Sequence, residues 1–167
     1  PQPMDIEWAK DGLTGHLYIV QARPETVHSQ KNLLKLEEFK LKKKGVVLVE
    51  GHSVGSKITS GKVEIIKDVH DITKFRRGAV LVTEMTDPDW VPVMKIASAI
   101  VTNRGGRTCH AAIVSRELGI PCVVGTIDGT DKIKNGQTVT IDCSQGDIGY
   151  VYRDKLPFRV KKTSLEE

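Results

Sequence analysis

The sequence predicts a β-rich α/β domain, and three observations support that fold class. Valine and isoleucine dominate the apolar residues, which make up 39% of the chain, and both residues favour strands. The apolar segments are short and bounded by glycine, of which the 167 residues contain 15. Only two or three segments between them have helical composition. We therefore expect one compact domain over residues 46–155, with further chain on both sides.

The elements of this domain can be placed from the composition of each segment and from the proline and glycine residues that bound it. Asp87-Pro88 is a good helix cap with proline at the first helical position, which predicts a helix over residues 90–97. A second helix is expected to end at Leu118, because Gly119 follows it. The expected strands are 46–49, 62–66, 79–83, 99–102, 121–124, 137–142 and 149–152.

Residues 1–28 precede the domain and predict a β-hairpin. Residues 5–9 and 17–23 have strand composition, and a glycine-containing turn at 10–12 separates them. A lone two-stranded hairpin is only marginally stable in water. We therefore expect residues 1–28 to be the tail of another domain.

Two linkers are expected to flank the domain. Residues 29–45 are polar and rich in lysine, Leu33 and Leu36 can share one face of a helix, and Gly45 can end it. This pattern predicts a linker helix over residues 29–45. Residues 156–167 are expected to form the second linker.

The segment of residues 105–116, GGRTCHAAIVSR, carries the chemistry. A glycine turn leads into a helix, and His110 lies in its first turn. Helix N-termini present unpaired N–H groups and partial positive charge, and both favour a phosphate. A neutral imidazole is also a nucleophile near physiological pH. We therefore expect His110 to be a catalytic histidine that becomes phosphorylated, rather than one that only binds phosphate.

The residues around His110 predict a phosphate-binding site. Gly105 and Gly106 allow close approach of the backbone and a positive φ. Thr108 is the expected N-cap, and its hydroxyl can bond to the helix or to a phosphate oxygen. Arg107 and Arg116 offer planar guanidinium donors, although Arg116 is expected to face partly away from His110.

Other patterns limit the function classes. Cys109, Cys122 and Cys143 have no CxxC spacing, which indicates reduced thiols in the cytoplasm. A zinc site on Cys109, His110 and Cys122 is disfavoured by the adjacent Cys-His pair.

The net charge of +4 comes mainly from residues 40–44 and 159–162. No aromatic residue interleaves with the lysines at 40–44, so we expect no nucleic-acid partner. No apolar run is long enough to span a membrane.

Residues 105–116 resemble the phosphohistidine signature of the PEP-utilising enzymes: two small residues, a variable one, Thr, a variable one, His, then small and aliphatic residues up to Arg. Residues 51–55, 86–89 and 117–125 are also similar to that family. The Arg-Thr-Cys-His-Ala form resembles the branch that makes phosphoenolpyruvate from pyruvate, ATP and water. Pyruvate phosphate dikinases and sugar-transport enzyme I usually carry serine before the histidine.

The resemblance implies a swivelling phosphohistidine (β/β/α) domain that relays a group between two other domains of one chain. An ATP-grasp domain would end in residues 1–28, where Glu7 would help hold Mg²⁺ and Gln21 and Arg23 would contact the nucleotide. A pyruvate/PEP barrel would follow residue 167. ATP would pass a pyrophosphoryl group to His110, hydrolysis would release phosphate, and the phosphohistidine would phosphorylate pyruvate. The resemblance also allows a homo-oligomer.

Two alternatives remain open at this point. The first is the equivalent domain of a pyruvate phosphate dikinase, which would use free phosphate as a co-substrate. The second is a non-catalytic module that keeps the fold and binds phosphate for regulation.

Overall fold

The computed structural model describes residues 4–24 and 35–164, and the chain divides into two compact units, Pro1–Lys35 and Leu36–Glu167. The first unit contains a hairpin of β1 (Met4–Lys10) and β2 (Leu17–Pro24), which pair antiparallel with an irregularity between Glu7 and Trp8. Asp11 begins the turn, and its carboxylate accepts hydrogen bonds from the amides of Leu13 and Thr14. These two bonds lower the pKa of Asp11.

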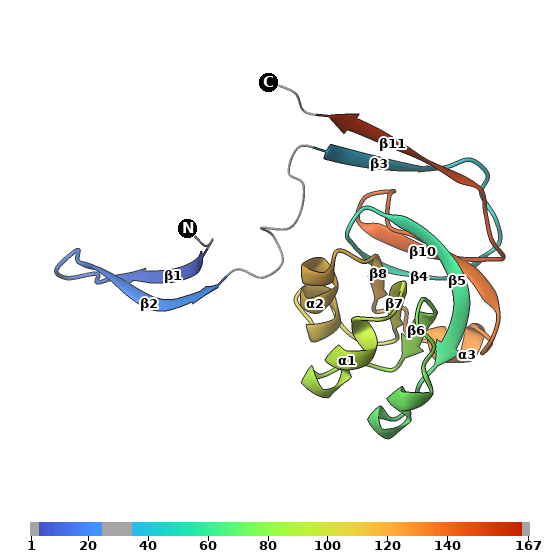
Figure 1. Cartoon of the computed structure of the whole chain (residues 1–167), viewed down its shortest axis with the longest axis horizontal. Helices are drawn as coiled ribbons and strands as arrows, with labels where there is room; N and C mark the ends of the chain where they lie inside the picture. Colours follow the sequence, from blue (N-terminus) through green and yellow to red (C-terminus); the bar gives the residue numbers. More distant parts are fainter. Residues whose placement is uncertain (1–3, 25–34, 165–167) are drawn as a thin grey trace. The chain divides into compact units, whose positions relative to one another are not determined.

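The second unit contains a closed seven-stranded barrel in the order β10-β4-β8-β7-β6-β5-β9. Neighbours from β5 to β8 pair in parallel, and the other pairs are antiparallel (Figure 1). The strands are β4 (Val47–Val54), β5 (Ile58–Ile65), β6 (Val80–Thr83), β7 (Ala99–Thr102), β8 (Cys122–Val124), β9 (Thr138–Asp142) and β10 (Ile148–Arg153).

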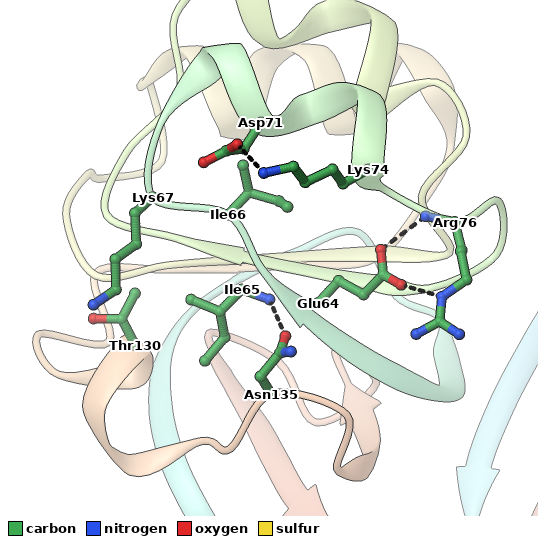
Figure 2. A pocket seen from close by; sticks show the side chains of 9 residues that line it. All are labelled: Glu64, Ile65, Ile66, Lys67, Asp71, Lys74, Arg76, Thr130 and Asn135. Carbon is green, nitrogen blue, oxygen red and sulfur yellow. Dashed lines mark hydrogen bonds and ion pairs between the residues drawn. The ribbon is translucent and has the colours of Figure 1, made fainter.

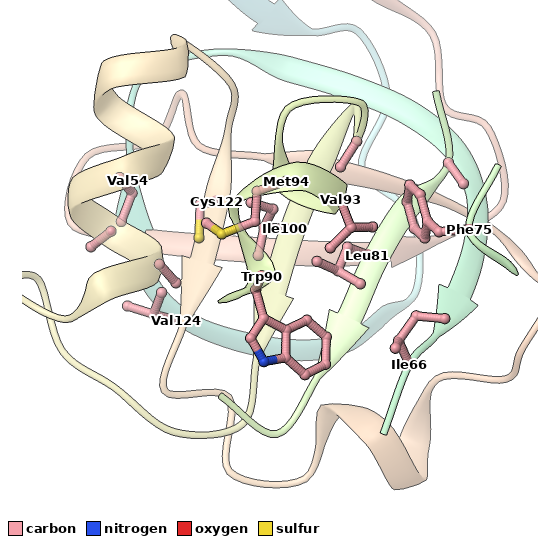
Figure 3. Close-up of a cluster of buried hydrophobic side chains, with 14 residues drawn as sticks. Val54, Ile66, Phe75, Leu81, Trp90, Val93, Met94, Ile100, Cys122 and Val124 are labelled. Carbon is pink, nitrogen blue, oxygen red and sulfur yellow. The ribbon is translucent and has the colours of Figure 1, made fainter. Parts of the chain in front are cut away.

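Every residue of β6, β7 and β8 is buried, which explains why these segments are continuously apolar rather than alternating. Successive residues face different cores, since side chains alternate across a strand. Val80 and Val82 pack in one cluster with Val63 and Val139. Leu81 packs in the other cluster, which lies under the helices (Figure 3). That second cluster includes Val54, Phe75, Trp90, Val93, Met94, Ile100, Ala111, Ala112, Cys122 and Val124.

Short helices connect the strands. Asp87 caps the 3₁₀ helix η3 (Pro88–Trp90) by accepting a hydrogen bond from the Asp89 amide, as the Asp-Pro pattern predicts. The α-helix α1 (Val91–Met94) continues from it, so the helix expected over residues 90–97 is shorter than predicted. The other helices are η2 (Val69–Lys74), α2 (His110–Leu118) and α3 (Gly129–Lys132). None of the helices described is long and apolar enough to cross a membrane.

The prediction of a linker helix over residues 29–45 is wrong where the structure describes that segment. Residues 35–41 form strand β3 (Lys35–Leu41), which pairs with β11 (Phe158–Ser164) in a two-stranded ribbon (Figure 1). Burial alternates along β3, with Phe39 and Leu41 partly buried and Lys40 exposed between them. This period of two fits a strand. Residues 29–34 lie outside the described residues.

Long-range contacts explain why the strand replaces a helix. The Phe39 and Phe158 rings lie 6.1 Å apart, and Lys162 Nζ lies 3.2 Å from Glu37 Oε1. The Lys42 amide also donates to the Pro157 carbonyl at 2.9 Å. A helix would satisfy its backbone locally but could not pair with β11. Residues 35–41 and 158–164, which lie in the two segments predicted as separate linkers, therefore form one ribbon.

Candidate functional site

The site forms where the parallel strands β6, β7 and β8 end. The connections after these strands carry Thr86, the turn at residues 103–109, and Gly125, respectively. Because the carboxyl ends of parallel strands meet at one edge of a sheet, residues distant in sequence gather there. His110 begins α2 immediately after the second connection.

The N-terminus of α2 is available to an anion. Cys109, not Thr108, is the N-cap, and its extended backbone (φ −71°, ψ 164°) has no side-chain capping bond. The prediction that Thr108 caps the helix is therefore wrong, because the helix begins one residue later than that role requires. Thr108 is exposed. Without a capping side chain, the first N–H groups of α2 remain open to a phosphate.

The backbone conformation and the close packing at position 105 require glycine. Its φ is +115°, and a Cβ there would lie 2.7 Å from Cys109 Sγ. Gly125 (φ +72°) lies beside it, and a Cβ on Gly125 would meet the Gly105 carbonyl oxygen at 2.8 Å. Gly106 differs, since a Cβ there has nothing within 4 Å. The space near Gly106 is consistent with its predicted role in close approach of a ligand, which stays a prediction.

Thr86 is the residue that sequence reasoning missed. Its Oγ1 lies 3.0 Å from Nδ1 of His110, and Thr86 is buried while His110 is half-buried. In the tautomer with the proton on Nδ1, that N–H donates to the threonine oxygen and the lone pair of Nε2 is free. Thr86 belongs to a segment that already resembles the family, but nothing in its spacing from His110 indicates the contact.

The two predicted phosphate-binding arginines are both engaged. Arg107 Nη2 lies 2.7 Å from the Asp147 carboxylate, whose turn joins β9 to β10. Arg116 Nη1 donates to the Arg107 carbonyl at 2.8 Å. Arg116 lies about one and two-thirds turns after His110 along α2. Arg116 thus holds the glycine turn in place, and Arg107 would have to exchange Asp147 for a phosphate.

The predicted nucleotide and metal residues lie on the hairpin of the first unit. Glu7 and Gln21 face each other across β1 and β2, and Arg23 pairs with Asp5 in the same register. Glu7 and Gln21 are exposed. In residues 4–24 and 35–164, no group of three or more His, Cys, Asp or Glu side chains could hold a metal ion. Glu7 alone therefore does not make a Mg²⁺ site.

Two of the three cysteines are structural: Cys122, which belongs to the disfavoured zinc set, and Cys143. Burial strongly raises the pKa of the Cys122 thiol, and Cys143 is also buried with a raised pKa. Cys143 Sγ donates to the Cys122 carbonyl at 3.3 Å. Both side chains pack in the cores as small apolar groups.

A cavity of 710 Å³ lies away from His110, and none of the predicted site residues lines it (Figure 2). Two of its three positive groups have carboxylate partners: Arg76 pairs with Glu64 and Lys74 pairs with Asp71, whereas Lys67 belongs to neither pair. Asn135 accepts a hydrogen bond from the Ile65 amide there. Carboxylates already neutralise two of the three cations that line the cavity, which makes it a weaker candidate for a phosphate than the start of α2.

Comparison with known proteins agrees with this geometry. Residues 75–146 match the family "PEP-utilising enzyme, mobile domain", and residues 1–44 match "Pyruvate phosphate dikinase, AMP/ATP-binding domain". Residues 75–146 therefore belong to the mobile-domain family of the PEP-utilising enzymes.

Among curated proteins, the relatives are phosphoenolpyruvate synthases. The one from Pseudomonas aeruginosa is 58% identical over 165 residues, and the one from Escherichia coli is 56% identical over 165 residues. Each comparison covers 99% of this chain and 21% of the relative. The Pyrococcus furiosus protein is 50% identical over 96% of this chain and 19% of its own length. The chain thus spans about a fifth of the relatives it matches.

Among solved structures, the solution structure of Enzyme I overlaps in part. It covers 48% of this chain and 33% of its own, with 28% identity and a TM-score of 0.41. We draw no conclusion from an overlap of that size.

Proposed function

We propose that this chain is the phosphohistidine carrier segment of a phosphoenolpyruvate synthase, in which Nε2 of His110 relays a phosphoryl group from ATP to pyruvate. The observation that carries the proposal is the contact of Thr86 Oγ1 with Nδ1 of His110 at the uncapped start of α2. One ring nitrogen is held, and the other is left as the nucleophile.

In the first step, the Nε2 lone pair attacks the β-phosphorus of ATP. A nitrogen–phosphorus bond forms, the bond to the oxygen of the α-phosphate breaks, and that electron pair leaves with AMP. Water then attacks the terminal phosphorus of the pyrophosphoryl group. The bridging phosphorus–oxygen bond breaks, phosphate is released, and phosphohistidine remains. Throughout, the Nδ1 proton remains hydrogen-bonded to Thr86, and the open N–H groups of α2 face the added charge.

In the second step, a base of the pyruvate-binding domain takes a methyl proton from pyruvate, and the resulting enolate oxygen attacks the phosphorus of phosphohistidine. The nitrogen–phosphorus bond breaks, its electron pair returns to Nε2, and phosphoenolpyruvate forms. The sum is ATP, pyruvate and water giving AMP, phosphate and phosphoenolpyruvate. Covalent relay through a histidine divides one difficult transfer into easier ones.

ATP as the donor is supported by the match of residues 1–44 to an AMP/ATP-binding domain family. Pyruvate as the acceptor is supported by the name of the relatives. An ATP-grasp domain and a pyruvate/PEP barrel in the same polypeptide would be the partners of this segment. The cysteines described are unpaired, which fits the reducing cytoplasm.

Mg²⁺ accompanies ATP in this proposal, but the hairpin supplies only the single carboxylate of Glu7 from the predicted set. The described residues do not form its site. We therefore derive no step through the metal, and assign its remaining ligands to the nucleotide and to the rest of the ATP-grasp domain.

Phosphoramidate, a small phosphoryl donor that reacts with histidine, tests the nucleophile on this chain itself. We expect a single phosphate on His110, and ³¹P NMR should assign it to Nε2. His70 provides the matched control, because it is the more exposed histidine, with 90% of its side chain accessible and its Nδ1 beside Asp68. Modification of His70 in preference to His110, or a phosphate on Nδ1, would contradict the proposal.

The alternative functions give different kinetics in the full-length enzyme. A pyruvate phosphate dikinase would form AMP only when free phosphate is supplied, whereas a synthase forms AMP without it. A non-catalytic module would bind phosphate but leave His110 unmodified by ATP.

A further inference from the structure

One buried side chain touches the connections that follow the parallel strands β6, β7 and β8. Asn103 begins the connection after β7 and is only 6% exposed. Its Nδ2 donates to Glu84 Oε2, after β6, at 2.6 Å and to Thr130 Oγ1, after β8, at 2.7 Å. Its Oδ1 accepts from the Thr130 amide at 3.0 Å.

The backbone of Asn103 reinforces the same links. Its amide donates to the Thr83 carbonyl at 3.1 Å, and its carbonyl accepts from the Ile127 amide at 2.9 Å. Gly129 is packed against the side chain, since a Cβ there would lie 3.2 Å from Asn103 Oδ1 and 2.6 Å from Thr126 Oγ1. A glycine at that position leaves room for Asn103 and Thr130 to meet.

Glu84 extends these links to the turn that leads to His110. Its Oε1 lies 2.8 Å from Arg104 Nε, and the Arg104 amide donates to the Glu84 carbonyl at 3.0 Å. Gly105, with its constrained φ, follows Arg104 directly. Glu84 itself precedes Thr86 by two residues. We call Glu84, Asn103, Arg104 and Thr130 the loop clamp.

The loop clamp joins the two connections that carry Thr86 and His110, whose side chains are in contact. Thr86 comes from the connection after β6, and His110 comes from the connection after β7. Their 3.0 Å contact therefore depends on how these two connections are held together. The Glu84–Arg104 pair is largely exposed, at 47% and 74% of the two side chains, so it contributes little to global stability.

We propose that Glu84 and Asn103 are positioning residues, which hold Thr86 against Nδ1 of His110 and so keep the lone pair on Nε2. The inference rests on the proposed function for its catalytic meaning, but the contact itself can be tested without phosphoryl transfer.

The test compares variants of the whole chain by ¹H–¹⁵N correlation spectra of the His110 ring and by rates of phosphorylation with phosphoramidate. Glu84→Ala removes the side-chain contacts of Glu84 with Asn103 and Arg104, whereas Glu84→Gln keeps an oxygen that can accept from Asn103. Asp128→Ala is the matched control, because it breaks the 3.0 Å pair between Asp128, which precedes α3, and Lys132, at the same edge of the sheet. Thr130→Val removes the hydroxyl contact to Asn103 without touching Glu84.

We expect Glu84→Ala to shift the ring from the Nδ1-protonated form to a mixture of tautomers and to slow phosphorylation about 10–100-fold. Thr130→Val should shift the ring in the same direction, while Glu84→Gln and Asp128→Ala should resemble wild type. Unchanged spectra and rates in folded Glu84→Ala and Thr130→Val would overturn the inference. A shifted tautomer in a chain whose wild type is never phosphorylated would support the loop clamp and refute the proposed function.

Discussion

At the scale of single residues, two features of the structure support the reactivity that we propose for His110. Thr86 Oγ1 lies 3.0 Å from Nδ1. The α2 N-terminus has no side-chain cap. The glycine signature predicts from the sequence that a helix begins near His110, because a turn before a helix is a local pattern, but it does not predict the missing cap, since Thr108 is the N-cap that the sequence indicates. The first joins residues 24 positions apart and requires the fold.

Thr86→Val should slow phosphorylation of His110 about fivefold to tenfold, because it removes one hydrogen bond while keeping the shape of the side chain. Thr86→Ser, which restores a hydroxyl, should recover most of the rate. Phosphoramidate kinetics at fixed pH measure both variants. A Thr86→Val rate equal to wild type would show that the contact does not control the nucleophile.

Cys122 and Cys143 should make the protein less stable at high pH. Burial raises the thiol pKa of both in the folded state. Below the usual thiol pKa of about 8.5, both states hold these protons; above it, only the unfolded chain releases them, so folding stability falls by up to about 1.4 kcal/mol per pH unit for each thiol.

Urea unfolding between pH 7 and pH 10 measures this dependence. Cys143→Ala removes one of the two thiols and should reduce the slope above pH 8.5, whatever its effect on stability at pH 7. If the free energy of unfolding falls with pH equally steeply in the variant and the wild type, the buried thiols do not cause the loss of stability at high pH.

At the scale of elements, the connection after β8 stores backbone strain. The Asp128 amide donates to the Thr126 carbonyl at 2.9 Å, which makes a γ-turn centred on Ile127. Ile127 has φ +72° and is 84% exposed. A branched side chain is disfavoured at positive φ, and an exposed one contributes little burial energy in return.

Ile127→Gly should therefore raise the free energy of unfolding by about 1 kcal/mol, since relief of strain exceeds the added flexibility of the unfolded chain. Ile148→Gly is the control: Ile148 is also exposed, at 45%, but lies within strand β10. That control should be destabilised instead. Urea unfolding compares the two, and destabilisation of Ile127→Gly would contradict the assignment of strain.

The ribbon of β3 and β11 shows where sequence reasoning fails at this scale. The lysine-rich segment has a weak helical pattern, and nothing within it indicates β11, which lies more than 100 residues away. Pairing decides the outcome because it satisfies backbone groups and brings Phe39 to Phe158. The strands β6, β7 and β8 were easier to predict, since each is short, almost wholly apolar and bounded by turn residues.

Phe39→Ser should loosen the ribbon without affecting the barrel. The contact of the two rings is lost, so the Lys42 amide, bonded to the Pro157 carbonyl, should exchange its hydrogen about tenfold faster. Amides of β6 and β7 should exchange at the wild-type rate. Equal acceleration in both places would mean that the ribbon and the barrel unfold as one unit.

At the scale of the whole molecule, the sequence indicates the fold class and the helix that carries His110, but not the closed barrel. Strand order depends on long-range pairing, such as β5 with β9 and β4 with β10, for which no local pattern exists. The loop clamp follows from that order, because parallel β6, β7 and β8 place their three connections at one edge. Glu84 and Asn103 could not be singled out without it.

The central claim is that His110 accepts a group from ATP, and one measurement tests it most directly. The full-length enzyme and its His110→Ala variant are incubated with Mg²⁺ and ATP labelled in the β-phosphate, and the peptides are mapped for acid-labile, base-stable label. The account predicts label on the peptide that contains His110 and none in the variant. Absence of label from a folded enzyme that binds ATP would contradict it and would indicate a phosphate-binding module.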